Sequence, residues 1–284
     1  MAQALRTSDL SEVPKRIQTS SRTVAPNSFL DGLRLDHGPI QQIGQFLLSA
    51  DQHVRALGIT LEFSPISTIV AVNSANQSSW GSFAPMLDTR NADLGVDNSY
   101  CLAGRGANGE IVATQAGRIY PFSARSLKAM ADDQSLYFGD GRAPQCDQPR
   151  CKLDAPAAEG ITGCMVYSGA LWVHPEFRGH RLAEILPRMS RAYALGRWNT
   201  DYTFAFVSDQ LLNSPLFRMY GYKSVAKGYS IWLHDEKIYE GSLMWMDRTE
   251  LVRDMSLFCS ANFAAQIDGA VGTGGRQHKL LAAG

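Results

Sequence analysis

The chain has 284 residues, 45% of them hydrophobic and 19% charged, and its 27 basic side chains balance its 27 acidic ones. This composition is typical of a globular protein with a sizeable core, and a neutral chain lacks the positive surface of a general nucleic-acid binder. No apolar run is long enough to span a membrane and the N-terminus has no hydrophobic secretory segment, so we expect a cytoplasmic protein without nucleic-acid or membrane partners.

The N-terminal half begins with a polar segment, residues 1–28, that we expect to be a flexible arm. Apolar residues at helical spacing then predict a helix from Ile40 to Leu57, which Gly58 can end. Residues 59–63 are a predicted strand, and for Ile66 to Val72 helix and strand both remain open. Two further predicted strands, 100–103 and 111–120, form a hairpin around a Gly-rich turn.

The middle of the chain is predicted to be a helix over 123–138, followed by a loop up to Gly160. This loop contains Cys146 and Cys151 close together, where we expect a local disulfide or two surface thiols rather than a zinc site. The five cysteines are an odd, thinly spread set, which favours reduced thiols. The histidines outside the turn described below show no grouping, so the sequence predicts no metal.

The C-terminal half alternates strands and helices. It contains a strand Gly163 to Val173, a helix Arg181 to Leu195 that Gly196 ends, a strand Thr203 to Val207, a short helix before Gly221, and strands near 222–225, 229–233 and 239–246. Such a mixture predicts an α/β or α+β sheet domain. We expect one domain over 29–260, with a Gly- and Ala-rich tail over 261–284.

One strand–turn–helix segment carries the chemistry. Its strand ends at Val173, Pro175 forbids continuation, and the turn Arg178-Gly179-His180-Arg181-Leu182-Ala183 enters a helix with a single apolar face. Such a turn presents free backbone N–H groups at the positive end of the helix dipole, where phosphate binds. The basic side chains of the turn add donors at the same place, although solvated arginines on an ordinary turn are the alternative.

The segment resembles the acetyl-CoA signature of the GNAT N-acetyltransferase superfamily, Val-x-Pro-x-x-Arg-Gly-x-x-Leu-Ala. The resemblance implies acetyl-CoA, or another acyl-CoA, as co-substrate and no metal. Its pyrophosphate would lie on Arg178, Gly179, His180, Arg181, Leu182 and Ala183. The backbones of Leu171 and Val173 would contact pantetheine, with Trp172 beside the acyl or acceptor pocket.

A second segment, from Asn213 to Tyr222, resembles the later GNAT helix that ends in Tyr-x-x-x-Gly-Phe. Ser214 is placed as its N-cap, and Asn213 and Phe217 would face the cofactor. The resemblance implies a mixed, mostly antiparallel twisted sheet with flanking helices and a splayed strand at the acyl-CoA site. In a minimal domain of this family the strands on either side of 123–160 are joined tightly, so this stretch is an insertion expected to wall the acceptor site.

The turn departs from the family at Arg181, where glycine is usual. Ordinary helical dihedrals there would tolerate arginine, whereas a close approach of the backbone to the ligand would not. Pro187 inside the helix is a second departure and predicts a kink.

The catalytic residues are less clear from the sequence. Phe217 stands where the family often has an acidic tyrosine, and Tyr220, one turn later, is the candidate general acid. The strand 163–173 carries no carboxylate, which leaves a water relay to Asp209 or to the insertion as possible bases.

The expected function is that of a GNAT-type acyltransferase, transferring acetyl from acetyl-CoA to a small amine or to a protein amine. Two alternatives stay open: a non-catalytic acyl-CoA-binding module, favoured by Phe217 and the missing carboxylate, and a synthase like those of acyl-homoserine lactones, with a longer acyl chain. By analogy with the fold, strands after Tyr222 can pair across a homodimer.

Overall fold

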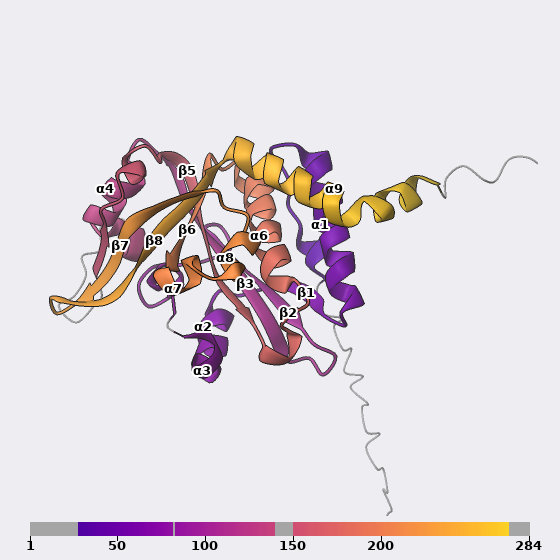
Figure 1. The fold of residues 1–284 in the computed structure, drawn as a ribbon, viewed down its shortest axis with the longest axis horizontal. Coiled ribbons are helices and arrows are strands. Elements are labelled where there is room, and N and C mark those ends of the chain that lie inside the picture. The colour runs from indigo at the N-terminus through magenta and orange to yellow at the C-terminus, as the bar shows by residue number, and fades with distance from the viewer. Residues whose placement is uncertain (1–27, 82, 140–149, 273–284) are drawn as a thin grey trace, which may run out of the picture.

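A single sheet of eight strands organises the part of the chain that the structure, a computed structural model, describes: residues 28–81, 83–139 and 150–272 (Figure 1). The order of its strands across the sheet is β1-β2-β3-β5-β6-β8-β7-β4. Their bounds are β1 Thr60–Ser64, β2 Ser99–Arg105, β3 Ile111–Ser123, β4 Arg150–Leu153, β5 Gly163–Val173, β6 Tyr202–Ser208, β7 Ser224–Leu233 and β8 Glu236–Asp247. The predicted mixed, mostly antiparallel sheet with flanking helices is confirmed.

The pair β5–β6 is parallel, whereas the other neighbouring strands are antiparallel. Only Met165–Tyr167 of β5 pair with Tyr202–Phe204 of β6, although both strands continue beyond this point. The two strands therefore separate toward their C-terminal ends, which is the predicted splay. A gap in the middle of a sheet leaves backbone groups without a neighbouring strand to bind.

One face of the sheet is covered by α6 (Leu182–Trp198), which packs on β3 and β5 and is itself covered by α1 (Ile40–Ala56) and α9 (Arg248–Gly272) (Figure 1). The side chains of Phe46, Phe258 and Phe263 form an aromatic cluster between α1 and α9. Because other helices cover α6, it is buried nearly all round from Ile185 to Gly196. Polar side chains on α6 therefore need partners inside the protein.

The opposite face is covered by the short elements α4 (Leu127–Asp132), α5 (Ser135–Phe138) and η2 (Pro85–Leu87). The helix α3 (Gln77–Trp80), which follows α2 (Ser67–Ala75), lies beside the end of β5. Arg118 and Tyr120 point to the same side of β3. Arg118 donates to the carbonyl oxygens of Met86 in η2 and Leu136 in α5, and the hydroxyl of Tyr120 donates to that of Leu136. The remaining short elements are η1 (Phe29–Gly32), η3 (Pro156–Glu159), η4 (Pro175–Phe177), α7 (Asp209–Leu212) and α8 (Pro215–Met219).

The predictions for the first helix, the hairpin and the strands β1, β5 and β6 are confirmed to within a few residues. The ambiguous segment from Ile66 to Val72 is mainly helical, as α2. The single helix predicted over 123–138 is wrong: β3 extends to Ser123, and Gln134, with φ 66°, separates α4 from α5.

The predicted loop up to Gly160 contains a strand, β4, which pairs with β7 at the sheet edge. Its alternation is short, and only pairing with a distant strand stabilises it. Cys151 is buried on this strand rather than on the surface, and Cys146 lies outside the described residues. The insertion thus contributes to the sheet as well as covering it.

The expected stop at Gly196 is wrong, because α6 continues to Trp198 and ends at Asn199 in the left-handed conformation. Gly196 serves packing instead: a Cβ there would lie 2.5 Å from Cδ2 of Leu35. The strands predicted at 222–225 and 229–233 are one strand, β7, with a register shift near Gly228. No sequence pattern predicted α9, which runs through the expected domain boundary at 260.

Candidate active site

The separation of β5 from β6 opens a cavity of about 350 Å³. One wall is formed by β5, from Ser168 to Leu171, and the facing wall by β6, from Ala205 to Ser208. These are the segments that follow the last paired residues, Tyr167 and Phe204. The cavity is therefore a direct consequence of the splay, and its volume is in the usual range of small-ligand sites, about 300–1,000 Å³.

A bulge shapes the β5 wall. Ala170 has φ 55°, and the register of β5 with β3 shifts at this point. The hydroxyl of Thr114 donates to the carbonyl oxygen of Ala170 at 2.9 Å, which fixes the bulge. A non-glycine residue with positive φ is uncommon, and bulges often re-aim the strand beside active sites. Leu171, a predicted pantetheine contact, lines the cavity directly after this bulge.

The side of the cavity away from α6 is aromatic. Trp80, Phe83, Tyr167, Phe206 and Tyr239 line it. Burial raises the pKa of Tyr167 and Tyr239, so both are neutral at physiological pH. This part of the cavity suits an apolar chain or ring.

Trp172 does not line the cavity. It is buried, stacks on Trp80 at 5.6 Å between ring centroids, and donates from Nε1 to the hydroxyl of Ser79 at 3.1 Å. Val173 ends β5 beside it, and its carbonyl oxygen accepts a hydrogen bond from Nε of Arg178. Trp172 thus fixes α3 and, through Trp80, the rim of the cavity.

The side facing α6 is polar. Gln115 of β3, Pro187 and Arg191 of α6, and Tyr220 and Tyr222 line it. Nε2 of Gln115 donates to the hydroxyl of Ser168 at 3.1 Å, and Nη2 of Arg191 donates to the carbonyl oxygen of Tyr220 at 2.7 Å. The cavity thus has an aromatic part and a polar inner end. We call Gln115, Arg191, Tyr220 and Tyr222 the inner end.

The turn from β5 into α6 carries five successive backbone N–H groups, those of residues 179–183, that donate to no acceptor among the described residues. They stand at the start of α6, a 17-residue helix. Gly179, with φ 86°, and Arg181, with φ 62°, bend the turn so that these groups follow one another. Free donors at the positive end of a helix dipole form an anion site, which fits a pyrophosphate.

The side chains of the turn point elsewhere. Nε and Nη2 of Arg178 donate to the carbonyl oxygens of Val173, at 3.2 Å, and Ser79, at 3.0 Å. His180 is exposed, Leu182 is buried under the helix, and Ala183 is half-buried. The free donors of the turn are therefore backbone groups, while Arg178 holds α3 against the end of β5.

Arg181 has left-handed dihedrals rather than helical ones, so it occupies a conformation that favours glycine. Its guanidinium binds Glu184 at 2.7 Å and the side-chain oxygen of Asn262 at 2.7 Å, and it lies 5.6 Å from the ring centroid of Phe258. The side chain is therefore turned toward α9. Contacts with α9 compensate part of the strain at a position where glycine would be unstrained.

Tyr220 lines the cavity, directly after α8. Burial raises the pKa of Tyr220 to about 12, which keeps its hydroxyl protonated. Phe217 is half-buried in α8 and Asn213 is exposed at the end of α7, and neither lines the cavity. Ser214 takes the N-cap position, but its hydroxyl donates to the carbonyl oxygen of Leu211 rather than capping α8.

No aspartate or glutamate is among the described residues that line the cavity. Asp209 follows the lining residue Ser208, and its Oδ1 is buried without a hydrogen-bond partner among the described residues. Cys164 lies at the start of β5, and burial, with the nearby carboxylate of Asp201, raises the pKa of its thiol to about 11. It is thus a poor nucleophile at neutral pH.

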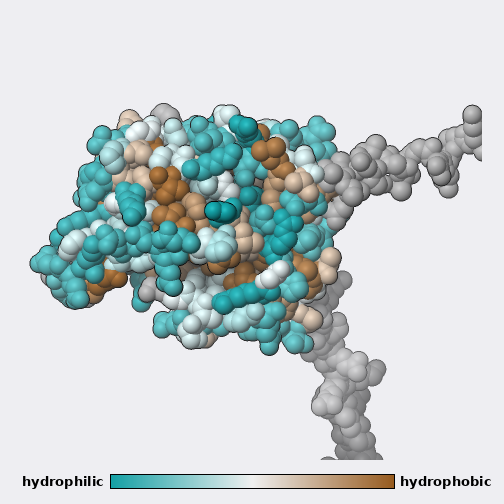
Figure 2. Space-filling view, viewed as in Figure 1, coloured by the Kyte–Doolittle hydropathy of each residue, from teal (hydrophilic) through white to brown (hydrophobic). Residues whose placement is uncertain are grey.

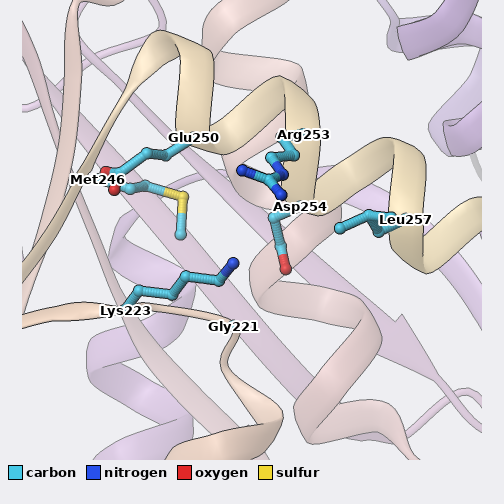
Figure 3. Close-up of a pocket in the computed structure, with 7 residues that line it drawn as sticks. All are labelled: Gly221, Lys223, Met246, Glu250, Arg253, Asp254 and Leu257. Carbon is cyan, nitrogen blue, oxygen red and sulfur yellow. The ribbon is translucent and has the colours of Figure 1, made fainter.

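A second, smaller hollow of about 120 Å³ lies between the segment before β7 and α9 (Figure 3). Lys223 faces Arg253 and Asp254 across it, with Glu250 at one side. Its two positive and two negative side chains cancel. On the face shown in Figure 2, hydrophobic side chains form small separate patches among hydrophilic ones.

The described residues hold no group of three or more potential metal ligands, and no described helix is long and apolar enough to cross a membrane. Sequence reasoning missed the inner-end residues Gln115, Arg191 and Tyr222. One signal was available for Arg191. It lies three residues after Arg188 in a helix whose remaining sequence is largely apolar, a spacing that places both on one buried face.

No family model and no curated protein matches the sequence. Several solved structures are similar to the chain. The acetyl-CoA complex of Arabidopsis thaliana NAA60 has 14% identity and a TM-score of 0.40, covering 67% of this chain and 99% of that one. A mutant of the spermidine/spermine N-acetyltransferase SpeG from Vibrio cholerae has 8% identity and a TM-score of 0.40, covering 69% and 97%. A putative phosphinothricin N-acetyltransferase has 13% identity and a TM-score of 0.37, covering 66% and 98%.

The mixed, mostly antiparallel sheet, the diverging pair β5–β6 and the strand–turn–helix segment are the features that the resemblance of the two motifs leads one to expect. Each motif has a connection to the cavity. The strand that leads into the first motif contributes Leu171 to the lining, and the second motif contributes Tyr220 and Tyr222. The turn of the first motif carries the free N–H groups at the start of α6.

Proposed function

We propose that this protein is an acyl-CoA-dependent N-acyltransferase that transfers an acyl group, with acetyl as the expected one, to an amine by direct attack on the thioester. One observation carries the proposal: β5, which lines the cavity where it separates from β6, is followed by a turn with five successive N–H groups that donate to no acceptor among the described residues. An anion site that follows a strand lining a cavity suits a pyrophosphate with a long arm.

In this proposal the pyrophosphate lies on the backbone of residues 179–183, and the pantetheine arm lies between the separated strands. The unpaired edge of β5 beyond Tyr167 supplies backbone hydrogen bonds to the arm, and Leu171 contacts it. Holding the thioester beside the amine supplies much of the acceleration, because positioning alone can be worth about 7–11 kcal/mol.

Tyr220 is proposed as the general acid that protonates the leaving thiolate, because it lines the cavity and its raised pKa keeps it protonated. The amine proton passes through water toward Asp209, whose carboxylate has one buried oxygen without a partner among the described residues. The acceptor is a small amine or a protein amine that reaches the cavity from its aromatic side.

Calorimetric titration with CoA and acetyl-CoA tests the cofactor site, and release of free thiol in the presence of an amine panel tests transfer. We expect micromolar binding and amine-dependent release. Tyr220→Phe should lower kcat by about 100-fold without changing CoA affinity. The pH–rate profile of the intact enzyme should show no limb from Tyr220 below about pH 11, because the pKa of its hydroxyl is about 12.

Absence of CoA binding would contradict the proposal. Binding without turnover of any amine would favour the non-catalytic module. Phe217 and the absence of a carboxylate among the described lining residues are the observations that favour this alternative. Equal kcat in Tyr220→Phe would remove only Tyr220 from the mechanism.

A further inference from the structure

The inner end of the cavity holds an arginine that the protein does not fully pair. Arg191 is 1% exposed, and it is the one charged side chain among the described residues that line the cavity. Its Nη2 donates to the carbonyl oxygen of Tyr220, but Nη1 is buried and has no hydrogen-bond partner in the part of the chain that the structure describes. A buried guanidinium with an unused donor is costly, so native proteins normally satisfy it.

The charges around Arg191 do not balance it. Asp254 of α9 accepts from Arg188 at 3.0 and 3.2 Å and from Arg191 only at 3.4 Å. Its carboxylate therefore belongs mainly to Arg188, and the next acidic side chain, Glu184, pairs with Arg181. The buried cluster on α6 thus keeps one positive charge in excess, and the excess lies at the cavity.

Two more residues of the inner end carry a buried polar atom without a partner among the described residues. They are Tyr222, through its hydroxyl, and Gln115, through Oε1. The guanidinium carbon of Arg191 lies 4.6 Å from the ring centroid of Tyr222, so the hydroxyl and the free Nη1 belong to one small region. Unsatisfied atoms on three residues that line one cavity indicate that a ligand completes them.

We propose that the inner end of the cavity is a carboxylate-binding site, in which Arg191 and Tyr222 hold an anionic group of one of the two substrates. This inference rests on the proposed acyltransferase function. A carboxylate accepts from a guanidinium and from a hydroxyl at once, and it neutralises the excess charge. The carboxylate belongs either to the acyl group, as in a dicarboxylic acyl-CoA, or to an amino-acid acceptor.

Two comparisons distinguish these sources. Succinyl-CoA and butyryl-CoA have acyl chains of four carbons that differ in a terminal carboxylate, and their dissociation constants are measured by calorimetry beside that of CoA. Amino acids and their carboxamides are compared as acceptors of acetyl by kcat/KM. We expect at least a tenfold preference for the carboxylate in one of the two comparisons, and its loss in Arg191→Met with unchanged affinity for CoA.

Tyr222→Phe is the matched variant, because its hydroxyl has no partner among the described residues and its removal breaks no bond in the fold. It should fold normally and reduce the preference about threefold to tenfold. A protein that binds CoA but prefers the carboxylate in neither comparison would overturn the inference, as would an undiminished preference in both variants.

A third measurement separates this inference from the proposed function. The thermal unfolding of the protein is measured without CoA, once in the presence of succinate and once in the presence of succinamide. A higher Tm with succinate that Arg191→Met abolishes would support the site even if CoA does not bind, in which case only the acyltransferase proposal fails. No CoA binding together with equal Tm values for both additives would reject both.

Discussion

The turn into α6 and the inner end of the cavity are the two proposed recognition sites, and they use different chemical groups although α6 contributes to both. The turn offers backbone N–H groups of residues 179–183, whereas the inner end offers side chains, above all Arg191. A backbone site keeps its donors whatever side chains it carries. Arg181 stands where the family has glycine, and the turn still presents its five free donors.

The inner end, in contrast, depends on the identity of its side chains. Arg191 comes from α6, Gln115 from β3 and Tyr222 from the segment before β7, and Asp254 of α9 holds the neighbouring Arg188. In the proposed carboxylate site each contributes one group, so loss of one member removes a contact that no other residue replaces. In the two proposals, the backbone recognises general features of the cofactor, and packed side chains recognise the substrate.

The greatest loss of stability is expected beside the inner end of the cavity, where charged side chains are buried. Asp254→Asn removes the carboxylate that two buried arginines share, and it should destabilise the fold by about 3–5 kcal/mol, as measured by urea unfolding. The matched control is Glu240→Gln, which breaks the exposed pair with Lys237 and should cost less than about 0.5 kcal/mol.

The same variant tests whether the two regions are independent. Its CoA affinity is measured without urea, under conditions in which the variant is folded. The turn does not contain Asp254, so the affinity should stay within about twofold of the original, or 0.4 kcal/mol. A stability change below about 0.5 kcal/mol would contradict the view that this carboxylate compensates buried charge, and a large loss of CoA affinity would contradict the independence of the two regions.

A smaller effect, on CoA affinity, is expected from a substitution in the turn into α6. His180→Glu places a carboxylate on an exposed residue of the turn, beside the proposed pyrophosphate. Repulsion between like charges should lower CoA affinity about tenfold, or 1.4 kcal/mol, and less at high salt. Stability should not fall, because a carboxylate near a helix N-terminus is favourable.

His180→Gln is the control for loss of the imidazole, and we expect it to change CoA affinity less than twofold. Equal affinities of the Glu and Gln variants would show that the phosphates bind away from this turn.

The sequence predicts the turn well because its information is local. A strand end, a proline, a glycine and an apolar helix face are all within about 25 residues, and together they determine where free N–H groups appear. The same locality explains why α1, the β2–β3 hairpin and β5 are predicted closely.

The strand β4 and the inner end escape such reasoning because their partners are distant in sequence. β4 is stabilised by pairing with β7, some eighty residues later in the chain. Arg191 forms an ion pair with Asp254, which lies on α9, a helix that no motif predicted. Arg181 was predicted only in part. The sequence identifies the departure from glycine, but only the fold shows that the residue has left-handed dihedrals and that its side chain contacts α9.

The smallest effect isolates the strain at Arg181. Arg181→Gly and Arg181→Ala both remove the contacts with Glu184 and Asn262, but only glycine relaxes at φ 62°. Arg181→Gly should therefore be more stable than Arg181→Ala by about 1 kcal/mol in urea unfolding, since the left-handed conformation costs an L-residue roughly 1–2 kcal/mol. CoA affinity should be similar in both, because neither variant removes a backbone N–H. If Arg181→Ala is as stable as Arg181→Gly, the backbone at this position is not left-handed in solution, and the order of the free donors along the turn has to be revised.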